Sequence, residues 1–596
     1  MIKNLRGAWL IMRIAFSADP FRSIAVIFLQ AGQAASGPMM VLWLKVLIDG
    51  VVDGRSDRIL LAAAGYGITL LILGISSYTA FKLSTVLSEK TSFAIDQRVI
   101  QLTSDLPSLE HHERADYQNE LQLLRAQREG LAGTVQALVY NFSNLVSLTL
   151  TVLLLANVHR VLLLLFLFAI PSLASSGWQV SIGQKAMEKT VERGRLSRHL
   201  YELGTTVAPA KEIRIFGLGD EISKRHSAEW RVVDKESNWA SLKGGAVSSL
   251  GWLIFALGYV GAIYVVARPA LDGKQINPGD IVLVMGLASQ LNSQLSQTVY
   301  MFAWLLQTLK TIGRFVWLVD YAKKAIPKIK DPIPAPDAIK QGIRLEGVSF
   351  SYPGTEREVL GEVNLTIPAG STVAIVGENG AGKTTLVKLL CRFYEPTTGQ
   401  ITVDGVPLAS MSFEEWRSRL SGGFQDFAKF EFIAREVVGI GQLANLEDVA
   451  SVEAALERAS ATDVAPDLPK GLETQLGKSF EDGEELSVGQ WQKLALGRAM
   501  MRELPLLLVL DEPTASLDAQ TEHALFERYS GAARRVAAAN GAITILVSHR
   551  FSTVRMADLI IVVDGGRITE VGTHDQLVAS GGLYAELFEL QARSYR

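Results

Sequence analysis

Long uncharged segments alternate with polar connectors over the first half of the chain. Six of these segments contain no Asp, Glu, Lys or Arg, and each is long enough to cross ~30 Å of hydrocarbon as a helix. Tyr, Trp, Lys and Arg gather at several of their ends, as they do at membrane interfaces. The pattern predicts six membrane spans, at residues 23–44, 59–81, 130–156, 161–184, 244–267 and 281–309.

The connectors between these spans alternate in length and charge. Residues 82–129 and 185–243 are long and carry most of the Lys and Arg of this half, whereas the other three connectors are short. Excess positive charge favours the cytoplasmic side, and an even number of spans then places both termini in the cytoplasm. Because the long connectors hold few helix breakers, we expect the helices to continue past the lipid and to reverse near Leu109–Glu120 and Thr205–Phe216.

Two flanking segments complete the predicted domain organisation. Residues 1–21 mix basic with large apolar side chains, which is typical of an amphipathic segment on the inner membrane face rather than of a secretory leader. They belong to a predicted transmembrane domain, residues 1–325. Residues 326–342 hold four prolines and predict an extended linker. Residues 343–596 predict a soluble α/β domain.

Composition narrows the choice of function. The net charge of the 596-residue chain is −3, which argues against a nucleic-acid partner held by bulk positive charge. A single cysteine, Cys391, excludes a disulfide framework and a cysteine metal cluster.

One stretch of the second half points to its chemistry. It reads Gly377-Glu378-Asn379-Gly380-Ala381-Gly382-Lys383-Thr384-Thr385. This matches the phosphate-loop pattern G-x-x-x-x-G-K-[ST] at every required position. An apolar run precedes it and a helical pattern follows, the context in which backbone N–H groups cradle a triphosphate. Lys383 is expected to reach the terminal phosphates and Thr384 to hold Mg²⁺.

An acidic pair supplies candidates for hydrolysis. The apolar run Leu506–Leu510 ends in Asp511 and Glu512. We expect Asp511 to hold Mg²⁺ and Glu512 to polarise the attacking water as a general base. Together with the phosphate loop, the pair predicts an ATPase with ATP and Mg²⁺ as its cofactors.

These motifs resemble those of the ATP-binding cassette family. The resemblance rests on the phosphate loop, on Leu486-Ser487-Val488-Gly489-Gln490, on Asp-Glu-Pro-Thr-Ala-Ser from residue 511, and on His549 after the run Ala542–Val547. Six spans fused ahead of one cassette look like an exporter half-transporter of the type IV group, which includes multidrug, lipid and peptide exporters. The resemblance implies a multidomain membrane protein, with an all-α six-helix transmembrane domain followed by an α/β P-loop NTPase domain.

The family's site roles carry over where this sequence matches. Tyr352 stands where an aromatic ring stacks on adenine, Gln425 where a glutamine senses Mg²⁺ and the attacking water, and His549 where a histidine holds the γ-phosphate. The residues implied to contact ATP are Tyr352, Gly377, Glu378, Asn379, Gly380, Ala381, Gly382, Lys383, Thr384, Thr385, Ser487, Gly489, Gln490 and Asp518. Those implied in catalysis are Glu512, His549 and Gln425, and those implied for Mg²⁺ are Thr384, Gln425 and Asp511.

The chain departs from the family pattern at two places. Val488 replaces the usual glycine of the signature, while the two contacting positions, Ser487 and Gly489, are kept. The stretch Gln425-Asp426-Phe427 and the Trp491 that follows the signature resemble a subgroup found with ribosomally made peptide antibiotics, including lantibiotic exporters.

The resemblance also implies a second chain. In this family the phosphate loop and the signature of one cassette cannot meet each other, so ATP is closed between two cassettes and Asp518 links the two sites. Because Glu512 and His549 are both present, a homodimer with two working sites is the simplest closure, and a heterodimer is the alternative. The other expected partners are the lipid bilayer and the exported small molecule or peptide. We expect the inner membrane of a bacterial cell, with the cassette in the cytoplasm.

The cargo is left open by the sequence. Gln290, Gln294 and Gln297 share one face of the sixth span, where polar groups line either a substrate pathway or a helix contact. We expect an ATP-driven exporter of an amphipathic substrate, with a peptide natural product as the first cargo hypothesis and a drug or lipid as the alternative. A function of another class would be an ATP-gated regulator or channel. Because no cysteine precedes Cys391, we expect another enzyme to process any exported peptide.

Overall fold

The computed structural model describes residues 2–594 with gaps at 127, 272–276, 327–328, 330, 513–530 and 532. The chain forms two compact units. One comprises Met1–Ser104 and Glu120–Ala322, and the other comprises Asp105–Asn119 and Lys323–Arg596. Part of the first long connector therefore belongs to the same unit as the α/β domain.

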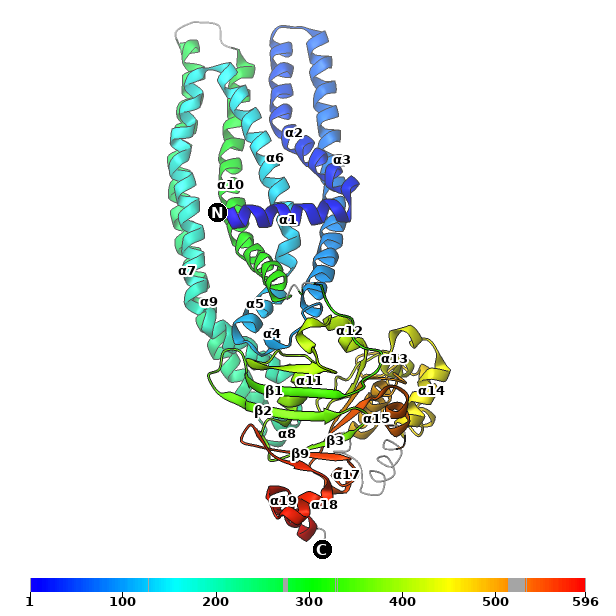
Figure 1. Ribbon diagram of the computed structural model, residues 1–596. Coiled ribbons are helices and arrows are strands. Elements are labelled where there is room, and N and C mark those ends of the chain that lie inside the picture. Colours follow the sequence, from blue (N-terminus) through cyan, green and yellow to red (C-terminus); the bar gives the residue numbers. More distant parts are fainter. Residues whose placement is uncertain are drawn as a thin grey trace. The chain divides into compact units, whose positions relative to one another are not determined.

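The first unit is built from long helices (Figure 1). In lipid, a helix satisfies its own backbone hydrogen bonds, which is why the uncharged segments fold this way. The elements are α1 (Ile2–Ala18), α2 (Pro20–Val52), α3 (Ser56–Ser104), α5 (Ala115–Ala126), α6 (Arg128–Val158), η1 (Arg160–Leu164), α7 (Leu165–Thr205), α8 (Ala210–Ile215), α9 (Gly219–Leu271) and α10 (Pro278–Ala325). The start of α5 and the end of α10 belong to the second unit.

Five helices among the described residues are long and apolar enough to cross a membrane. They are Pro20–Val52, Ser56–Ser104, Gly133–Val158, Arg160–Thr205 and Gly219–Arg268, and they contain the first five predicted spans apart from the first residues of the third. The sixth predicted span, 281–309, lies within α10. Several side chains of α10 fall outside the described part of the chain, and this span stays a prediction.

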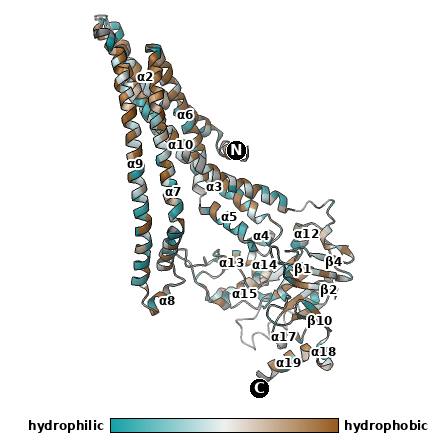
Figure 2. Ribbon diagram, turned by 90° about the vertical axis from the view of Figure 1, so that its left-hand side faces the viewer, coloured by the Kyte–Doolittle hydropathy of each residue, from teal (hydrophilic) through white to brown (hydrophobic). Residues whose placement is uncertain are grey.

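Helices α7 and α9 run antiparallel, side by side (Figures 1 and 2). Ion pairs join them beyond their apolar portions, with Lys189 Nζ 2.6 Å from Glu236 Oε1 and Arg193 Nη1 2.9 Å from Glu229 Oε2. Figure 2 shows both helices changing from hydrophilic residues near α8 to more hydrophobic residues at their far ends. The chain reverses at α8, inside the predicted range Thr205–Phe216.

Helix α1 lies across the other helices of this unit (Figure 1). Gly7 permits its close approach to α10, because a Cβ at this position would lie 2.2 Å from Cγ2 of Ile312. Arg6 pairs with Asp320 of α10, with Nη2 3.3 Å from Oδ1. The amphipathic segment predicted at the N-terminus is thus a helix fixed to the bundle.

The second unit contains two sheets. A four-stranded antiparallel sheet has the order β2 (Glu358–Pro368), β1 (Gly342–Ser351), β4 (Thr398–Val403) and β5 (Val406–Pro407). A six-stranded sheet has the order β10 (Arg567–Gly572), β9 (Leu559–Asp564), β3 (Thr372–Val376), β8 (Ile543–Val547), β7 (Leu507–Asp511) and β6 (Leu420–Gly423). Its neighbours pair in parallel except β9 and β10. Strands β3 and β8 are buried at every residue, which explains their unbroken apolar sequence.

Short helices complete this unit. They are α4 (Glu110–Glu113), α11 (Lys383–Leu390), η2 (Leu408–Ser410), α12 (Phe413–Ser418), α13 (Ala434–Gly439), η3 (Leu443–Asn445), α14 (Val449–Arg458), η4 (Ala465–Asp467), η5 (Gly471–Glu473), α15 (Val488–Ala499), α17 (Phe551–Val554), α18 (His574–Ser580) and α19 (Leu583–Ser594). A first core packs the two sheets against α11. A second core joins α13, α14 and α15. The predicted fold class, a helical membrane domain followed by an α/β domain, is confirmed.

The segment Asp105–Asn119 is attached to this unit by backbone contacts. The N–H group of Leu109 donates to the carbonyl of Phe393 at 3.2 Å, and the Leu109 side chain packs against the first core. The Arg417 guanidinium donates to the carbonyl of Pro107. The segment overlaps the turn that the sequence predicted at Leu109–Glu120 and begins four residues before it.

Candidate nucleotide site

The phosphate loop connects β3 to α11, and two of its glycines have backbone angles at which any other residue is strained. Gly377 has φ +148°, and a Cβ there would lie 2.0 Å from the carbonyl oxygen of Val563. Gly382 caps α11 with φ +109°, and its Cβ would lie 2.8 Å from Leu360 Cδ2. Only glycine combines such backbone angles with so little space. The loop is therefore shaped by its sequence to turn N–H groups toward an anion.

Lys383 begins α11 and points into this loop. Its Nζ lies 2.8 Å from the carbonyl oxygens of both Gly377 and Glu378. Burial lowers the pKa of Lys383, and the charges of Glu512 and Asp511 partly offset that effect. The predicted phosphate-binding lysine and the predicted acidic pair are thus close enough to interact electrostatically.

Asp511 is a buried carboxylate at the end of β7. Burial, followed by the charges of Glu512 and Asp426, raises the pKa of Asp511 to about 6, although Lys383 and a hydrogen bond from Thr384 act in the opposite direction. A buried carboxylate beside a hydroxyl offers the oxygen ligands that Mg²⁺ prefers. Thr384 and Asp511 therefore fit the metal that the sequence predicts.

Two predicted catalytic residues, Gln425 and His549, both contact the third, Glu512. The Gln425 amide donates to Glu512 Oε2 at 2.9 Å, and His549 Nδ1 lies 3.1 Å from Oε1. Gln425, Glu512 and His549 follow the adjacent strands β6, β7 and β8, whose carboxyl ends form one edge of the sheet. Glu512 has φ +47°, a strained angle for a residue with a side chain. Its N–H group donates to the Val547 carbonyl at 2.9 Å, which holds that angle in place.

Tyr352 contacts the helix that the phosphate loop opens. Its hydroxyl lies 3.0 Å from Thr385 Oγ1. Its ring meets the rings of Phe350 and Tyr394 edge-on, with centroids 5.0 and 5.4 Å away. The predicted adenine-stacking residue therefore adjoins the phosphate loop.

The signature residues lie at the start of α15, on the second core. Ser487 and Gln490 form a reciprocal cap, in which Ser487 Oγ accepts from the Gln490 N–H and Gln490 Oε1 accepts from the Ser487 N–H. Gly489 is in the first turn, where backbone N–H groups have no partner within the helix. Val488 is 61% exposed, so its replacement of glycine changes no core packing. No described contact joins these residues to the phosphate loop, which lies on the first core, and Asp518 lies outside the described residues.

Comparison with known protein families shows which family the chain belongs to. A model of the ABC transporter transmembrane region matches residues 23–295, and a model of the ABC transporter matches residues 360–515. An ATP-dependent lipid A-core flippase of Xanthomonas campestris pv. campestris is 30% identical over 430 residues, which are 68% of this chain and 68% of that protein. The chain belongs to the ABC transporter family.

Further comparisons cover from about half to nearly all of the chain. An ATP-dependent lipid A-core flippase of Alcanivorax borkumensis is 26% identical over 568 residues, 94% of this chain and 93% of that protein. One of Bordetella avium is 34% identical over 335 residues, and the chain spans about half of its length (54%). A solved bacterial Atm1-family ABC exporter with ATP bound is 24% identical, with a TM-score of 0.73 over 96% of this chain and 97% of that one. That structure shows the shared fold.

The comparisons confirm two predictions at the level of the family. They support the architecture of a type IV exporter half-transporter, and they assign residues 360–515 to the ABC transporter family. The roles of individual site residues remain predictions.

Two residues that suggested a peptide exporter have packing roles in this ABC transporter. Trp491 is buried in the second core, and Phe427 packs against that core. Packing therefore accounts for both side chains without any reference to cargo.

The glutamine face of α10 is divided between helix contacts and exposed surface. Buried Gln294 donates through Nε2 to Ser147 Oγ at 2.9 Å and to Thr151 Oγ1 at 3.3 Å, both on α6. Gln290 donates to the Gly37 carbonyl of α2 at 3.3 Å. Gln297 is exposed. Two of the three predicted pathway residues thus link helices in this structure.

Two charged residues beside the site were not predicted. Lys388 on α11 and Glu113 on α4 lie 3.0 Å apart. The sequence gave one indication that Lys388 has a specific role, because it is the single charged residue in the otherwise apolar run Leu386–Leu390. The sequence gave no such indication for Glu113, because its contact with Lys388 forms only in the folded chain.

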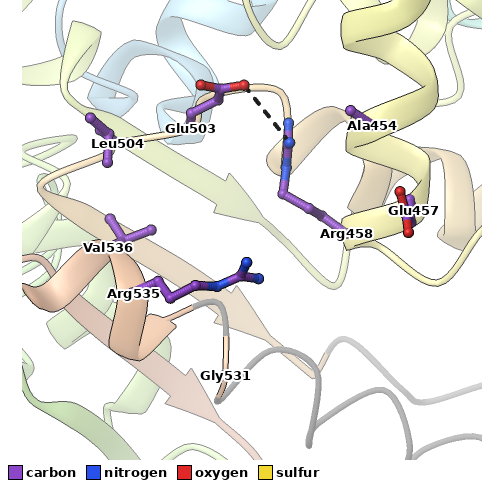
Figure 3. Close-up of a pocket in the computed structure, with 8 residues that line it drawn as sticks. All are labelled: Ala454, Glu457, Arg458, Glu503, Leu504, Gly531, Arg535 and Val536. Atoms are coloured by element: carbon purple, nitrogen blue, oxygen red, sulfur yellow. Dashed lines mark ion pairs between the residues drawn. The ribbon is translucent and has the colours of Figure 1, made fainter. Parts of the chain in front are cut away.

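A cavity of about 740 Å³ elsewhere in the cassette is distinct from this site (Figure 3). Arg458, Glu503 and Arg535 line it, and none of the predicted ATP-site residues that the structure describes is among its lining residues. Arg458 is already engaged, since its Nη1 lies 3.9 Å from Glu503 Oε1 and its Nε donates to the Met500 carbonyl. Cavity size is therefore a poor guide to the nucleotide site of this ABC transporter.

Proposed function

We propose that this ABC transporter is an ATP-driven exporter whose cargo is a lipid, of the kind handled by lipid A-core flippases. The observation that carries the proposal is similarity to such a flippase over 94% of the chain, which includes the membrane domain. Membrane spans without Asp, Glu, Lys or Arg suit an amphipathic molecule that keeps its apolar part in the bilayer.

The cassette supplies the residues for hydrolysis. Glu512 is the general base, which takes the proton of a water molecule as that water attacks the γ-phosphorus of ATP. Gln425 and His549 hold its two carboxylate oxygens in place through their contacts at 2.9 and 3.1 Å. Lys383 binds the terminal phosphates. Thr384, Asp511 and Gln425 are the proposed Mg²⁺ ligands, and the ion would neutralise the phosphate charge.

A second copy of the chain is the proposed partner. Ser487 and Gly489 lie on a different core from the phosphate loop, so each site needs the signature of another cassette. The tip of the second connector supports the same partner, because Val207, Ile215 and Phe216 are 89%, 77% and 68% exposed. Apolar surface of this kind marks a protein interface. We propose a homodimer in a bacterial inner membrane, with the cassettes in the cytoplasm.

Cargo stimulation of ATP hydrolysis tests this proposal. With the protein in liposomes, we expect lipid A to raise the rate of phosphate release and an amphipathic cationic peptide to leave it unchanged. Stimulation by the peptide alone would favour the peptide natural product that the sequence suggested first. Hydrolysis without transport of any cargo would favour the ATP-gated regulator or channel.

A further inference from the structure

The segment Asp105–Asn119 reaches the nucleotide site through one ion pair. Glu113 Oε1 lies 3.0 Å from Nζ of Lys388, which is on the helix that the phosphate loop opens. Both residues belong to one compact unit. Their side chains are 38% and 25% exposed, so water screens this pair less than a fully exposed one.

The Lys388 ammonium also covers an aromatic pair. Its Nζ lies 5.3 Å from the ring centre of Tyr352 and 5.7 Å from that of Tyr394, which is within the range of a cation–π contact. Burial acts to lower the pKa of Lys388, but the hydrogen bond and charge of Glu113, with a contribution from Tyr352, outweigh it and the pKa is raised. The lysine is therefore held in its charged form between a carboxylate and two rings.

Tyr352 has few orientations open to it. Its ring stands at 80° to Phe350 and 85° to Tyr394. A base that stacks on Tyr352 must use the ring face that Lys388 does not cover. The position of the ammonium thus determines which face of the ring a base can use.

We propose that Glu113 and Lys388 are positioning residues for the purine base of ATP. Glu113 holds the ammonium of Lys388 against Tyr352, and Tyr352 presents its other face to the base. This inference rests on the proposed function only in taking ATP as the nucleotide. Because Glu113 lies in the first long connector of the membrane domain, a movement of that connector changes the affinity for the base. By linkage, binding of the base biases the connector in return.

The substitution Glu113→Gln tests the proposal with little change in shape. We expect the KM for ATP to rise roughly 3–10-fold, in line with a cation–π contact, while kcat stays within about twofold. Binding of inorganic triphosphate, which has no base, is expected to remain unchanged. Asp116→Asn is the matched control, because Asp116 pairs with Arg114 inside the same segment, at 2.7 Å. This control should leave the KM for ATP unaltered.

Substitutions of Lys388 complete the test. Lys388→Met should raise the KM for ATP as Glu113→Gln does, whereas Lys388→Arg should keep the original affinity because a guanidinium also stacks on rings. The double variant Glu113→Gln/Lys388→Met should have the same KM as Lys388→Met alone. An unchanged KM in Glu113→Gln would overturn the proposal, as would an equal loss of inorganic triphosphate binding. Nucleotide binding is measured without cargo, so failure here is distinct from failure of the lipid-export proposal.

Discussion

Gln425 donates a hydrogen bond from its side-chain amide to Oε2 of Glu512, at 2.9 Å. The two residues follow β6 and β7, neighbouring strands of the parallel sheet. This hydrogen bond fixes the orientation of the carboxylate that is the proposed general base. The sheet topology thus places a residue that orients the proposed base directly beside it.

Removing the Glu512 carboxylate should stop hydrolysis and leave ATP binding intact. In Glu512→Gln we expect phosphate release to fall ~10²–10⁴-fold, the usual contribution of a general base. The phosphate loop and Lys383 are untouched, so nucleotide affinity should stay within a few-fold of the original. Glu453→Gln, an exposed glutamate on α14, serves as the control and should keep the full rate. Loss of ATP binding together with hydrolysis would contradict the assignment.

The hydroxyl of Tyr352 should compete with ATP for Thr385. The two hydroxyls are 3.0 Å apart, and Thr385 is a predicted phosphate contact. Tyr352→Phe keeps the ring and removes one hydrogen bond of about 1 kcal/mol, so ATP should bind with equal or several-fold higher affinity. Tyr352→Ala removes the ring and should weaken binding ~10-fold or more. If both variants weaken ATP binding equally in a direct binding assay, the stacking role is wrong.

Asp511 should make the folded cassette less stable as pH rises. Its pKa is about 6 in the folded chain against an ordinary value of 3.8. Between these values the folded state binds a proton that the unfolded state has released, so stability falls with rising pH across this window and levels off above it. The full penalty is on the order of 2–3 kcal/mol. Asp511→Asn should therefore raise the melting temperature at pH 7.5 and change it little at pH 4.

The control for this pH dependence is Asp482→Asn. Asp482 is exposed, 3.5 Å from Lys470 in the same unit, so its substitution should shift the melting temperature little at either pH. A stabilisation by Asp511→Asn that is the same at pH 4 and pH 7.5 would refute the burial of a charge at this site.

Gln294 and Gln297 should behave differently although they lie on one helix. Gln294→Ala removes two bonds to α6 and should cost about 1 kcal/mol of stability, a typical value for polar contacts between membrane helices. Gln297 is exposed, and Gln297→Ala should keep the melting temperature while reducing cargo-stimulated ATP hydrolysis. If Gln294→Ala and the unmodified protein have the same melting temperature in detergent, Gln294 does not stabilise the contact between α10 and α6.

Local sequence was enough to propose the residues of the candidate cassette site, and their roles remain predictions. The phosphate loop and Glu512 each follow a short and largely buried strand, and Asp511 ends one, so their motifs fix the local backbone as well as the chemistry. Parallel strands end at a common edge, which explains why Gln425 and His549 meet Glu512 from distant parts of the sequence.

The remaining predictions depended on tertiary contacts, which local sequence patterns do not show. Periodicity placed Gln290, Gln294 and Gln297 on one face but gave no information about the partner helices, so helix contact and substrate pathway stayed open. The docking of Glu113 on Lys388 joins residues 275 positions apart, and no local pattern encodes such a contact. The burial of Trp491 likewise follows from packing of the second core, although the sequence suggested a subgroup signature.

The central claim is that ATP hydrolysis by this protein drives lipid export. The most direct test is to measure whether lipid movement depends on Glu512. The full-length protein is placed in liposomes with a fluorescently labelled lipid, and the label that a membrane-impermeant reductant can reach is measured with and without ATP and Mg²⁺. We predict ATP-dependent redistribution of the lipid between the two leaflets, and none in Glu512→Gln. An active ATPase that leaves the lipid in place, or equal redistribution in Glu512→Gln, would contradict the account.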